Sequence, residues 1–224
     1  MIKGILFDLD GVITDTAQLH YLAWKQIVKE FGIEYSEEEN DKLRGLPRKD
    51  TLLAIFKLKN FRNDLSDNEL NDLCTKKNNL YLEYLNKYVN KDYLLPGIEQ
   101  FLKDIKKDKI KTAIASSSYN APLILEKLGV KDYFDVIVDP ARVKRGKPAP
   151  DIFIIAKDDL NLNNEQCVGI EDAVAGINAL NDANIKSIAI TNNNDKLFKD
   201  ASLLLKSTNE LNWKTIKSFF NKNK

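Results

Sequence analysis

Cysteine is scarce in this chain of 224 residues: Cys74 and Cys167 are the only two, and they lie far apart in the sequence. That number excludes a disulfide framework, and it is too small for a structural zinc site. We expect each cysteine to be a buried or inert thiol.

The chain also lacks an excess of charge and any long apolar run. Its 34 basic and 33 acidic side chains give a formal net charge of +1, which provides no electrostatic case for binding nucleic acid or an anionic membrane. No stretch approaches the roughly 20 apolar residues of a membrane span, and the N-terminus lacks the apolar core of a signal peptide. We therefore expect a cytoplasmic protein without nucleic-acid or membrane partners. No obvious exposed apolar stripe suggests more than a monomer.

What the chain does contain is an alternation of short apolar runs with helical patterns. The apolar runs, which are typical of buried parallel strands, lie at 2–7, 111–115, 136–138, 168–170 and 185–190. The helical patterns lie at 98–105, 121–128, 151–160 and 174–183. This alternation predicts an α/β fold whose parallel sheet is covered by helices on both faces.

One long segment interrupts the alternation. From about 17 to 89 there is no strand-like run, and the apolar spacing is that of consecutive amphipathic helices. We expect residues 16–90 to form a small helical domain inserted into an α/β core made of residues 1–15 and 91–224. The two links to the core would lie close together and act as a hinge.

Two carboxylates end the first apolar run. Asp8 and Asp10 follow directly after 5–7, and burying unpaired charges within a strand would cost several kcal/mol or more. Residues i and i+2 share a face, so both acids are expected to point into the crevice at the carboxyl edge of the sheet. They indicate a cation site, a nucleophile with its acid/base partner, or both. Gly11 lets the backbone turn sharply after them.

Three further polar clusters follow apolar runs. Small hydroxyls and backbone amides at 116–120 form a cradle for phosphate oxygens, although one serine could serve only as a helix N-cap. Lys147 stands in a proline-rich turn, where it would offset phosphate charge or be an ordinary surface lysine. Glu171 and Asp172 are two more acids, which on their own could reflect the preference for negative charge at a helix N-terminus.

Together the four clusters predict phosphoryl transfer. Acid pairs at two strand ends supply hard oxygen ligands that suit Mg²⁺ better than zinc or copper. The hydroxyl cradle and the lysine neutralise phosphate charge. A carboxylate nucleophile attacking phosphorus needs all of these groups, because catalysis of phosphoryl transfer is mainly positioning and charge compensation.

These residues, in order, resemble the four signature motifs of the haloacid dehalogenase superfamily. The matching positions are Asp8-x-Asp10-Gly11-Val12, Ser116, Lys147 and Glu171-Asp172. The resemblance implies a Rossmann-like parallel-sheet core with an inserted all-helical cap domain. The acid at position 10 weighs against the dehalogenase branch, which lacks one there.

The resemblance also implies a role for each motif residue. Asp8 is the nucleophile that forms an aspartyl-phosphate, and Asp10 is the general acid/base. Ser116 and Lys147 bind the transferring phosphoryl group. One Mg²⁺ per chain is expected to bind to Asp8, to the backbone carbonyl of Asp10 and to Asp172, with Glu171 beside it. Asp8 and Asp10 would therefore serve both catalysis and metal binding.

Within the superfamily, the details resemble the β-phosphoglucomutase branch. The extension of the first motif, residues 11–17, includes Thr16 and is followed by His20, the only histidine, and then by Trp24. By this resemblance His20 hydrogen-bonds Asp10 and couples substrate arrival to the positioning of the acid/base. Trp24 either lines the sugar pocket or packs the cap helices together.

The segment 43–51 resembles that branch's substrate-specificity loop. Arg48 is the candidate for gripping the non-reacting phosphate, since guanidinium groups match phosphate oxygens. Lys77 and the neighbouring Asn78 either reach the substrate or belong to a solvated helix. The remaining expected substrate contacts are Thr16, Gly45, Leu46, Thr51, Ser117, Ser118 and Asn120.

The function implied is a sugar phosphomutase that converts β-glucose 1-phosphate to glucose 6-phosphate. Phospho-Asp8 would transfer its phosphoryl group to the 6-hydroxyl, and glucose 1,6-bisphosphate would act as both intermediate and priming cofactor. The alternatives are a sugar-phosphate phosphatase of the same fold and a non-catalytic phosphosugar-binding regulator. The complete set of catalytic side chains argues against the regulator.

Overall fold

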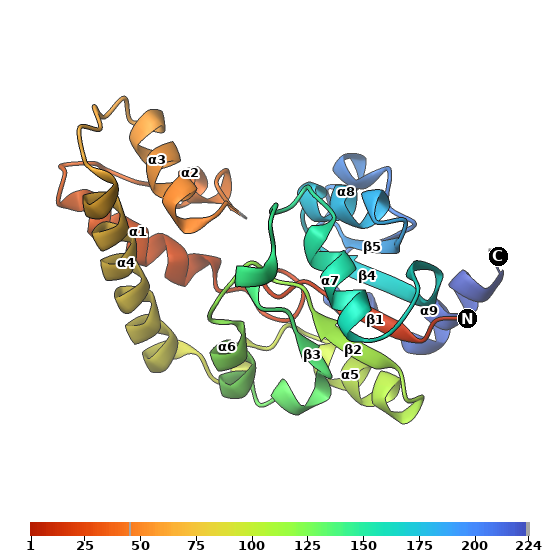
Figure 1. The fold of residues 1–224 in the computed structure, drawn as a ribbon. Coiled ribbons are helices and arrows are strands. Elements are labelled where there is room, and N and C mark those ends of the chain that lie inside the picture. The colour runs from red at the N-terminus through yellow and green to blue at the C-terminus, as the bar shows by residue number, and fades with distance from the viewer. Residues whose placement is uncertain (45, 223–224) are drawn as a thin grey trace. The chain divides into compact units, whose positions relative to one another are not determined.

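The computed structural model describes residues 1–44 and 46–222, and it confirms the predicted α/β fold (Figure 1). Six parallel strands form one sheet in the order β3-β2-β1-β4-β5-β6. Their bounds are β1 Gly4–Phe7, β2 Lys111–Ile114, β3 Val136–Ile137, β4 Cys167–Glu171, β5 Lys186–Ile190 and β6 Leu203–Leu205.

Helices cover both faces of the sheet. They are α5 Ile98–Lys107, α6 Ala121–Leu128, α7 Asp151–Asp159, α8 Val174–Asp182 and α9 Trp213–Lys222. Leu6 packs in one core cluster with Phe153 of α7 and Leu180 of α8. The next residue, Phe7, points to the other face, where its ring meets Phe101 of α5.

Single turns of 3-10 helix complete this part of the chain. They lie at Lys91–Tyr93, Lys131–Tyr133, Pro140–Arg142, Asn164–Gln166, Asp195–Phe198 and Thr208–Glu210. No helix among the described residues is both long enough and apolar enough to cross a membrane.

The chain divides into two compact units. The sheet belongs to a unit made of Met1–Asp15 and Asn90–Lys224, and the second unit is Thr16–Val89. The sequence interpretation assigned residue 90 to the helical segment, whereas the structure places it with the sheet. Asn90 belongs with the sheet unit because its side chain caps the turn Lys91–Tyr93, where Oδ1 accepts the Asp92 N–H at 2.7 Å.

The second unit, over its described residues, consists of helices and contains no strand. The helices are α1 Ala17–Lys29, α2 Glu37–Asp41, α3 Arg48–Leu58 and α4 Asp67–Tyr88. Capping boxes begin α2 at Ser36 and α4 at Ser66, each closed by a glutamate three residues on. A separate apolar core holds the unit together and includes Trp24, Ile27, Leu52, Ile55, Phe56, Leu70 and Leu73.

The segments that leave and re-enter the sheet unit are fastened to each other. Thr14 forms an antiparallel bridge with Leu94, and its hydroxyl donates to the Tyr93 carbonyl at 2.7 Å. The Leu95 N–H donates to the Ile13 carbonyl at 2.9 Å. The helical unit is therefore inserted between two points of the chain that are in direct contact.

Candidate active site

The predicted site residues follow the three central strands. Phe7 at the end of β1 is in register with Ile114 of β2 and with Ile170 of β4, so these strands end level with one another. Asp8 comes next, and its N–H donates to the Ile170 carbonyl at 3.0 Å. Ser116 follows β2, and Glu171 is the last residue of β4. The sheet thus places Asp8 near residues that are far from it in the sequence.

The turn after Asp8 brings the fourth motif onto the first. Gly11 has a φ of +83°, a left-handed conformation that favours glycine. A Cβ atom at this position would lie 1.9 Å from Oδ2 of Asp172. The missing side chain is therefore what lets the Asp172 carboxylate lie directly against this turn.

Lys147 joins the first and fourth motifs by charge. Its Nζ donates to Oδ1 of Asp8 at 2.6 Å and to Oε1 of Glu171 at 2.5 Å. The same atom lies 5.0 Å from the centre of the Phe153 ring. The lysine side chain is only 16 % exposed and that of Glu171 is 1 % exposed, so both charges are largely removed from water.

These charges shift each other's titration. Burial lowers the pKa of Lys147, but the neighbouring charges of Asp8 and Glu171 outweigh it and hold the pKa above its usual value. Burial raises the pKa of Glu171, and the charge of Lys147 opposes that rise. Oε2 of Glu171 also accepts the N–H groups of Asp172 and Ala173, both at 3.1 Å. The lysine is a fixed cation at neutral pH.

Three of the predicted carboxylates form an oxygen cluster. Asp8, Glu171 and Asp172 each offer one oxygen, and these atoms all lie within 4.8 Å of one another. Carboxylate oxygens at such separations fit a hard divalent cation such as Mg²⁺. Asp10 lies outside this cluster of side chains, and it is half-buried in the turn, where it bridges to Thr14.

The hydroxyl cradle is an ordered turn. Ser116 is buried, and its Oγ accepts the Ser118 N–H at 3.1 Å. Oγ of Ser118 in turn accepts the Asn120 N–H at 3.3 Å, while Ser117 is exposed. Asn120 is the N-cap of α6, so the alternative in which a serine caps this helix is wrong.

In the helical unit, the half-buried His20 contacts the buried Lys77. The Lys77 side chain is 2 % exposed, and its Nζ contacts Nδ1 of His20 at 2.6 Å. The same ammonium lies 4.7 Å from the Tyr81 ring centre and 5.3 Å from that of Trp24. Lys77 is therefore no part of a solvated helix face, and Trp24 packs the helices of this unit together.

Thr16 also lies in this cluster, where its Oγ1 is 2.8 Å from the Tyr81 hydroxyl. Burial lowers the pKa of His20 well below its usual value, and the charges of Lys77, Arg48 and Arg44 lower it further. A neutral His20 can accept a hydrogen bond from Lys77 through Nδ1.

This lowered pKa gives the stability of the protein a predictable pH dependence. Unfolded His20 titrates near pH 6.5, so below that pH the unfolded state binds a proton that the folded state excludes. The stability that His20 contributes is therefore lost as pH falls below 6.5, by up to about 1.4 kcal/mol per pH unit. Urea unfolding at several pH values between 5 and 7.5 measures the loss. His20→Gln should show a shallower decline, and equal slopes would contradict the assignment.

Arg48, which is predicted to bind the non-reacting phosphate, is the first residue of α3. Nη2 of Arg48 donates to Oδ1 of Asn78 at 2.8 Å, which fixes the guanidinium against α4. The Thr51 hydroxyl donates back to the Pro47 carbonyl at 3.1 Å, and Leu46 is 44 % exposed. The predicted contact at Gly45 lies outside the described residues.

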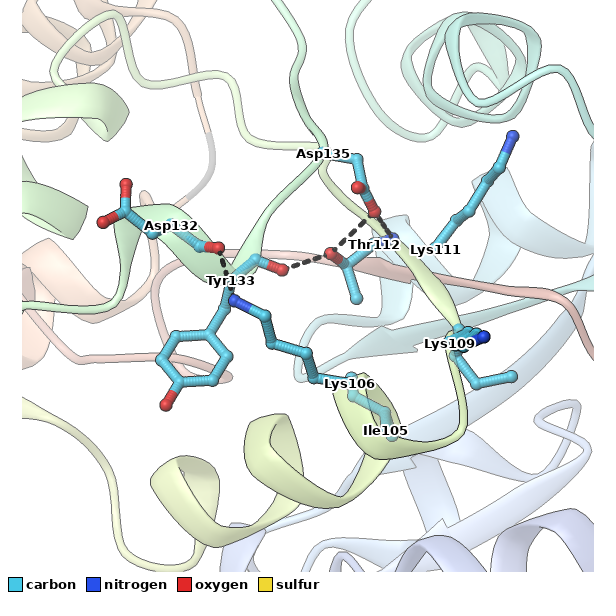
Figure 2. A pocket seen from close by; sticks show the side chains of 9 residues that line it. Ile105, Lys106, Lys109, Lys111, Thr112, Asp132, Tyr133 and Asp135 are labelled. Atoms are coloured by element: carbon cyan, nitrogen blue, oxygen red, sulfur yellow. Dashed lines mark hydrogen bonds between the residues drawn. The ribbon is translucent and has the colours of Figure 1, made fainter.

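A separate hollow of about 240 Å³ lies at the other end of β2 (Figure 2). Lys106 is one of the residues that line it, and its Nζ donates to the Asp132 carbonyl at 3.2 Å and lies over the Tyr133 ring. The hollow adjoins Lys111 and Thr112 at the amino end of the strand. It shares no residue with the predicted site, whose Ser116 follows the carboxyl end.

Phe153 and Gly176 were not predicted for the site. Phe153 lies beneath Lys147 and Gly176 beside Glu171. Phe153 has the sequence signature of an ordinary core residue, whereas a glycine inside the helical pattern at 174–183 is a weak signal of a close contact. Only the packing of α7 and α8 onto the sheet brings them to the charged groups.

The parallel α/β sheet with an oxygen cluster and a half-buried lysine at its carboxyl edge suits phosphoryl transfer, which needs charged groups held in place around a phosphate. Residues 5–190 match the family model of the haloacid dehalogenase-like hydrolases, and the chain belongs to this family.

Individual relatives are similar over almost the whole chain. The β-phosphoglucomutase of Bacillus subtilis is 39% identical over 209 residues, covering 93% of this chain and 91% of the relative. The crystal structure of a β-phosphoglucomutase from Clostridium difficile has a TM-score of 0.93 at 39% identity and covers 100% of this chain and 99% of that one. A phosphorylated carbohydrates phosphatase of Thermotoga maritima is 29% identical over 188 residues, or 83% of each chain.

Proposed function

We propose that this protein is a β-phosphoglucomutase, an intramolecular phosphotransferase that interconverts β-glucose 1-phosphate and glucose 6-phosphate. Its similarity at 39% identity to two proteins of that name supports the proposal. The observation that carries it is a second cationic group, Arg48, fixed on Asn78 in the helical unit and separate from Lys147 in the sheet unit. A mutase must hold a sugar with two phosphates, whereas hydrolysis of a monophosphate needs one phosphate site.

Asp8 is the proposed nucleophile because its carboxylate is held in place by Lys147 at the edge of the sheet. The lysine ammonium and the amides of the Ser116 turn neutralise the charge of the phosphoryl group. Asp8 and Asp172, with Glu171 beside them, would hold Mg²⁺ together with the Asp10 carbonyl, and the ion would supply further charge compensation at this place. Asp10 removes the proton from the 6-hydroxyl that receives the phosphoryl group.

The helical unit contributes specificity in this proposal. Arg48 grips the phosphate that is not reacting, with a planar guanidinium that matches phosphate oxygens. His20, kept neutral and hydrogen-bonded to Lys77, is available to position the acid/base. Glucose 1,6-bisphosphate both primes Asp8 and is the intermediate that reorients between the two half-reactions.

A sugar-phosphate phosphatase is the second candidate, and the similarity to the Thermotoga phosphatase favours it. One assay distinguishes the two functions. The protein is supplied with β-glucose 1-phosphate, Mg²⁺ and a trace of glucose 1,6-bisphosphate, and both glucose 6-phosphate and free phosphate are measured. We expect isomerisation to exceed phosphate release by far. Phosphate release in excess would replace the mutase with the phosphatase, and no product would favour a binder or another sugar.

Arg48→Ala should separate the two activities. Loss of a charge-assisted contact to the non-reacting phosphate is expected to lower kcat/KM for isomerisation by about 100-fold, in line with 1.5–3 kcal/mol for such a bond. Hydrolysis of p-nitrophenyl phosphate, which has no second phosphate, should change less than threefold. Arg62→Ala removes an exposed arginine of the same unit and should change neither rate. Equal losses in the two assays for Arg48→Ala would remove the argument for a second phosphate site.

A further inference from the structure

We propose that Gly176 is a positioning residue of the active site, and that the absence of its side chain sets the place of the Glu171 carboxylate. The inference rests on the proposed role of Lys147 in phosphoryl transfer, but it does not depend on whether the acceptor is a sugar or water. It assigns a function to a residue inside α8 that acts through another side chain, that of Glu171.

A side chain at this position would require the Glu171 carboxylate to move. A Cβ atom built on Gly176 would lie 2.0 Å from both Cδ and Oε1 of Glu171, and 2.5 Å from its Oε2. These are the carboxylate atoms themselves, so the backbone of α8 forms one wall of the space that the carboxylate fills. Gly176 is itself buried, and this wall is not open to solvent.

On its other sides, the Glu171 carboxylate accepts hydrogen bonds from groups whose positions depend on it. Oε2 accepts the N–H groups of Asp172 and Ala173, where α8 begins. Oε1 receives Nζ of Lys147, which also holds Oδ1 of Asp8 at 2.6 Å. A carboxylate pushed away from Gly176 would give up contacts to this lysine or to these amides. Either loss changes how the Lys147 ammonium faces the nucleophile.

Backbone conformation does not explain the glycine. Gly176 has no positive φ, unlike Gly11, and lies within the regular helix Val174–Asp182. A glycine inside a helix is less favourable than alanine, so alanine would improve the helix itself. The contact with Glu171 is the feature of this position that opposes a side chain.

The test compares Gly176→Ala in two backgrounds. In the otherwise native protein, turnover of p-nitrophenyl phosphate with Mg²⁺ is expected to fall at least tenfold, because the methyl group displaces the carboxylate. In the Glu171→Ala background the methyl group meets no carboxylate, and it should change turnover less than twofold. The melting temperature in EDTA, measured on the same four proteins, should fall with Gly176→Ala in the native background and rise with it in the Glu171→Ala background.

Asn178→Ala is the matched control, because it places alanine at an exposed position of the same helix. It should leave turnover unchanged. The inference would be overturned if Gly176→Ala retained native turnover. It would also be overturned if Gly176→Ala caused the same fold-change in turnover and the same shift in melting temperature in both backgrounds. Where Glu171→Ala leaves too little turnover to measure, the sign of the melting shift decides. A native protein that hydrolyses the ester but fails to isomerise the sugar phosphate would overturn the proposed mutase and leave this inference standing.

Discussion

Asp8→Asn is expected to abolish turnover of every phosphate ester, with a loss of at least about 10⁴-fold. Removing the nucleophile from a set of cooperating catalytic residues causes losses of this order in other enzymes. The amide has nearly the shape of the carboxylate, but it is a poor nucleophile for phosphorus. It also removes one anion from the oxygen cluster with Glu171 and Asp172. Turnover of p-nitrophenyl phosphate and of β-glucose 1-phosphate measures the loss.

Folding should survive this change, which separates chemistry from structure. Lys147 keeps Glu171 as a counter-charge at 2.5 Å, and the Asp8 N–H bond to the Ile170 carbonyl involves only backbone. Asp182→Asn, which removes an exposed carboxylate at the end of α8, is the matched control and should retain native turnover. Residual turnover above about 1 % of native with Asp8→Asn would contradict the role of Asp8 as nucleophile.

Lys147→Met should have the largest effect on stability and a large effect on rate. Methionine fills similar space over Phe153 but leaves the buried carboxylate of Glu171 without its cation and close to Asp8. Removing one partner of a buried ion pair costs about 3–5 kcal/mol. Losing a cation placed on the transferring group costs about 10²–10³-fold in kcat, by comparison with other charge-stabilising donors. Urea unfolding and ester turnover measure the two losses.

A second variant tests the cause of the instability. Lys147→Met combined with Glu171→Gln removes both the cation and the buried anion, so stability should recover by about 1–3 kcal/mol relative to the single variant. Turnover should stay low, because the lysine is still missing. If the two substitutions destabilise additively, the ion pair does not account for the stability of this edge of the sheet.

The sequence was sufficient to predict the sheet because short apolar runs are a local pattern. Apolar runs identify β1, β2, β4 and β5 to within two residues at each end. Polar residues at the strand ends meet because parallel strands in register end together. The sharp turn expected at Gly11 is present, and the structure adds its second purpose, the close approach of Asp172.

Two elements were missed because their signal is weak. β6 is only three residues long, and two of them are half-buried. The apolar residues of α9, Trp213, Ile216 and Phe220, have helical spacing but stand among lysines and asparagines. Asp108 secures this helix by accepting from Nε1 of Trp213 at 2.7 Å, a contact with no sequence signature.

The contacts of the charged groups in the helical unit were harder still to predict from the sequence. A lysine on an amphipathic helix is ordinarily solvated, and only the packing of Tyr81 and Trp24 around Lys77 makes it a buried partner of His20. Gly176 was missed for a related reason, because its contact depends on how α8 lies on β4. Patterns predict which residues share a face, while close contacts between faces depend on the tertiary structure.

The fastening of Ile13 and Thr14 to 93–95 has a consequence for folding kinetics. Before β1 can pair with β2, the chain must close a loop that spans the entire helical unit, and such distant pairings slow folding. A helical unit that folds first, through its local contacts, would bring the two ends together and shorten the effective loop. We therefore expect helix formation to precede sheet formation, and the oxygen cluster, which needs β1 beside β4, to be among the last features completed.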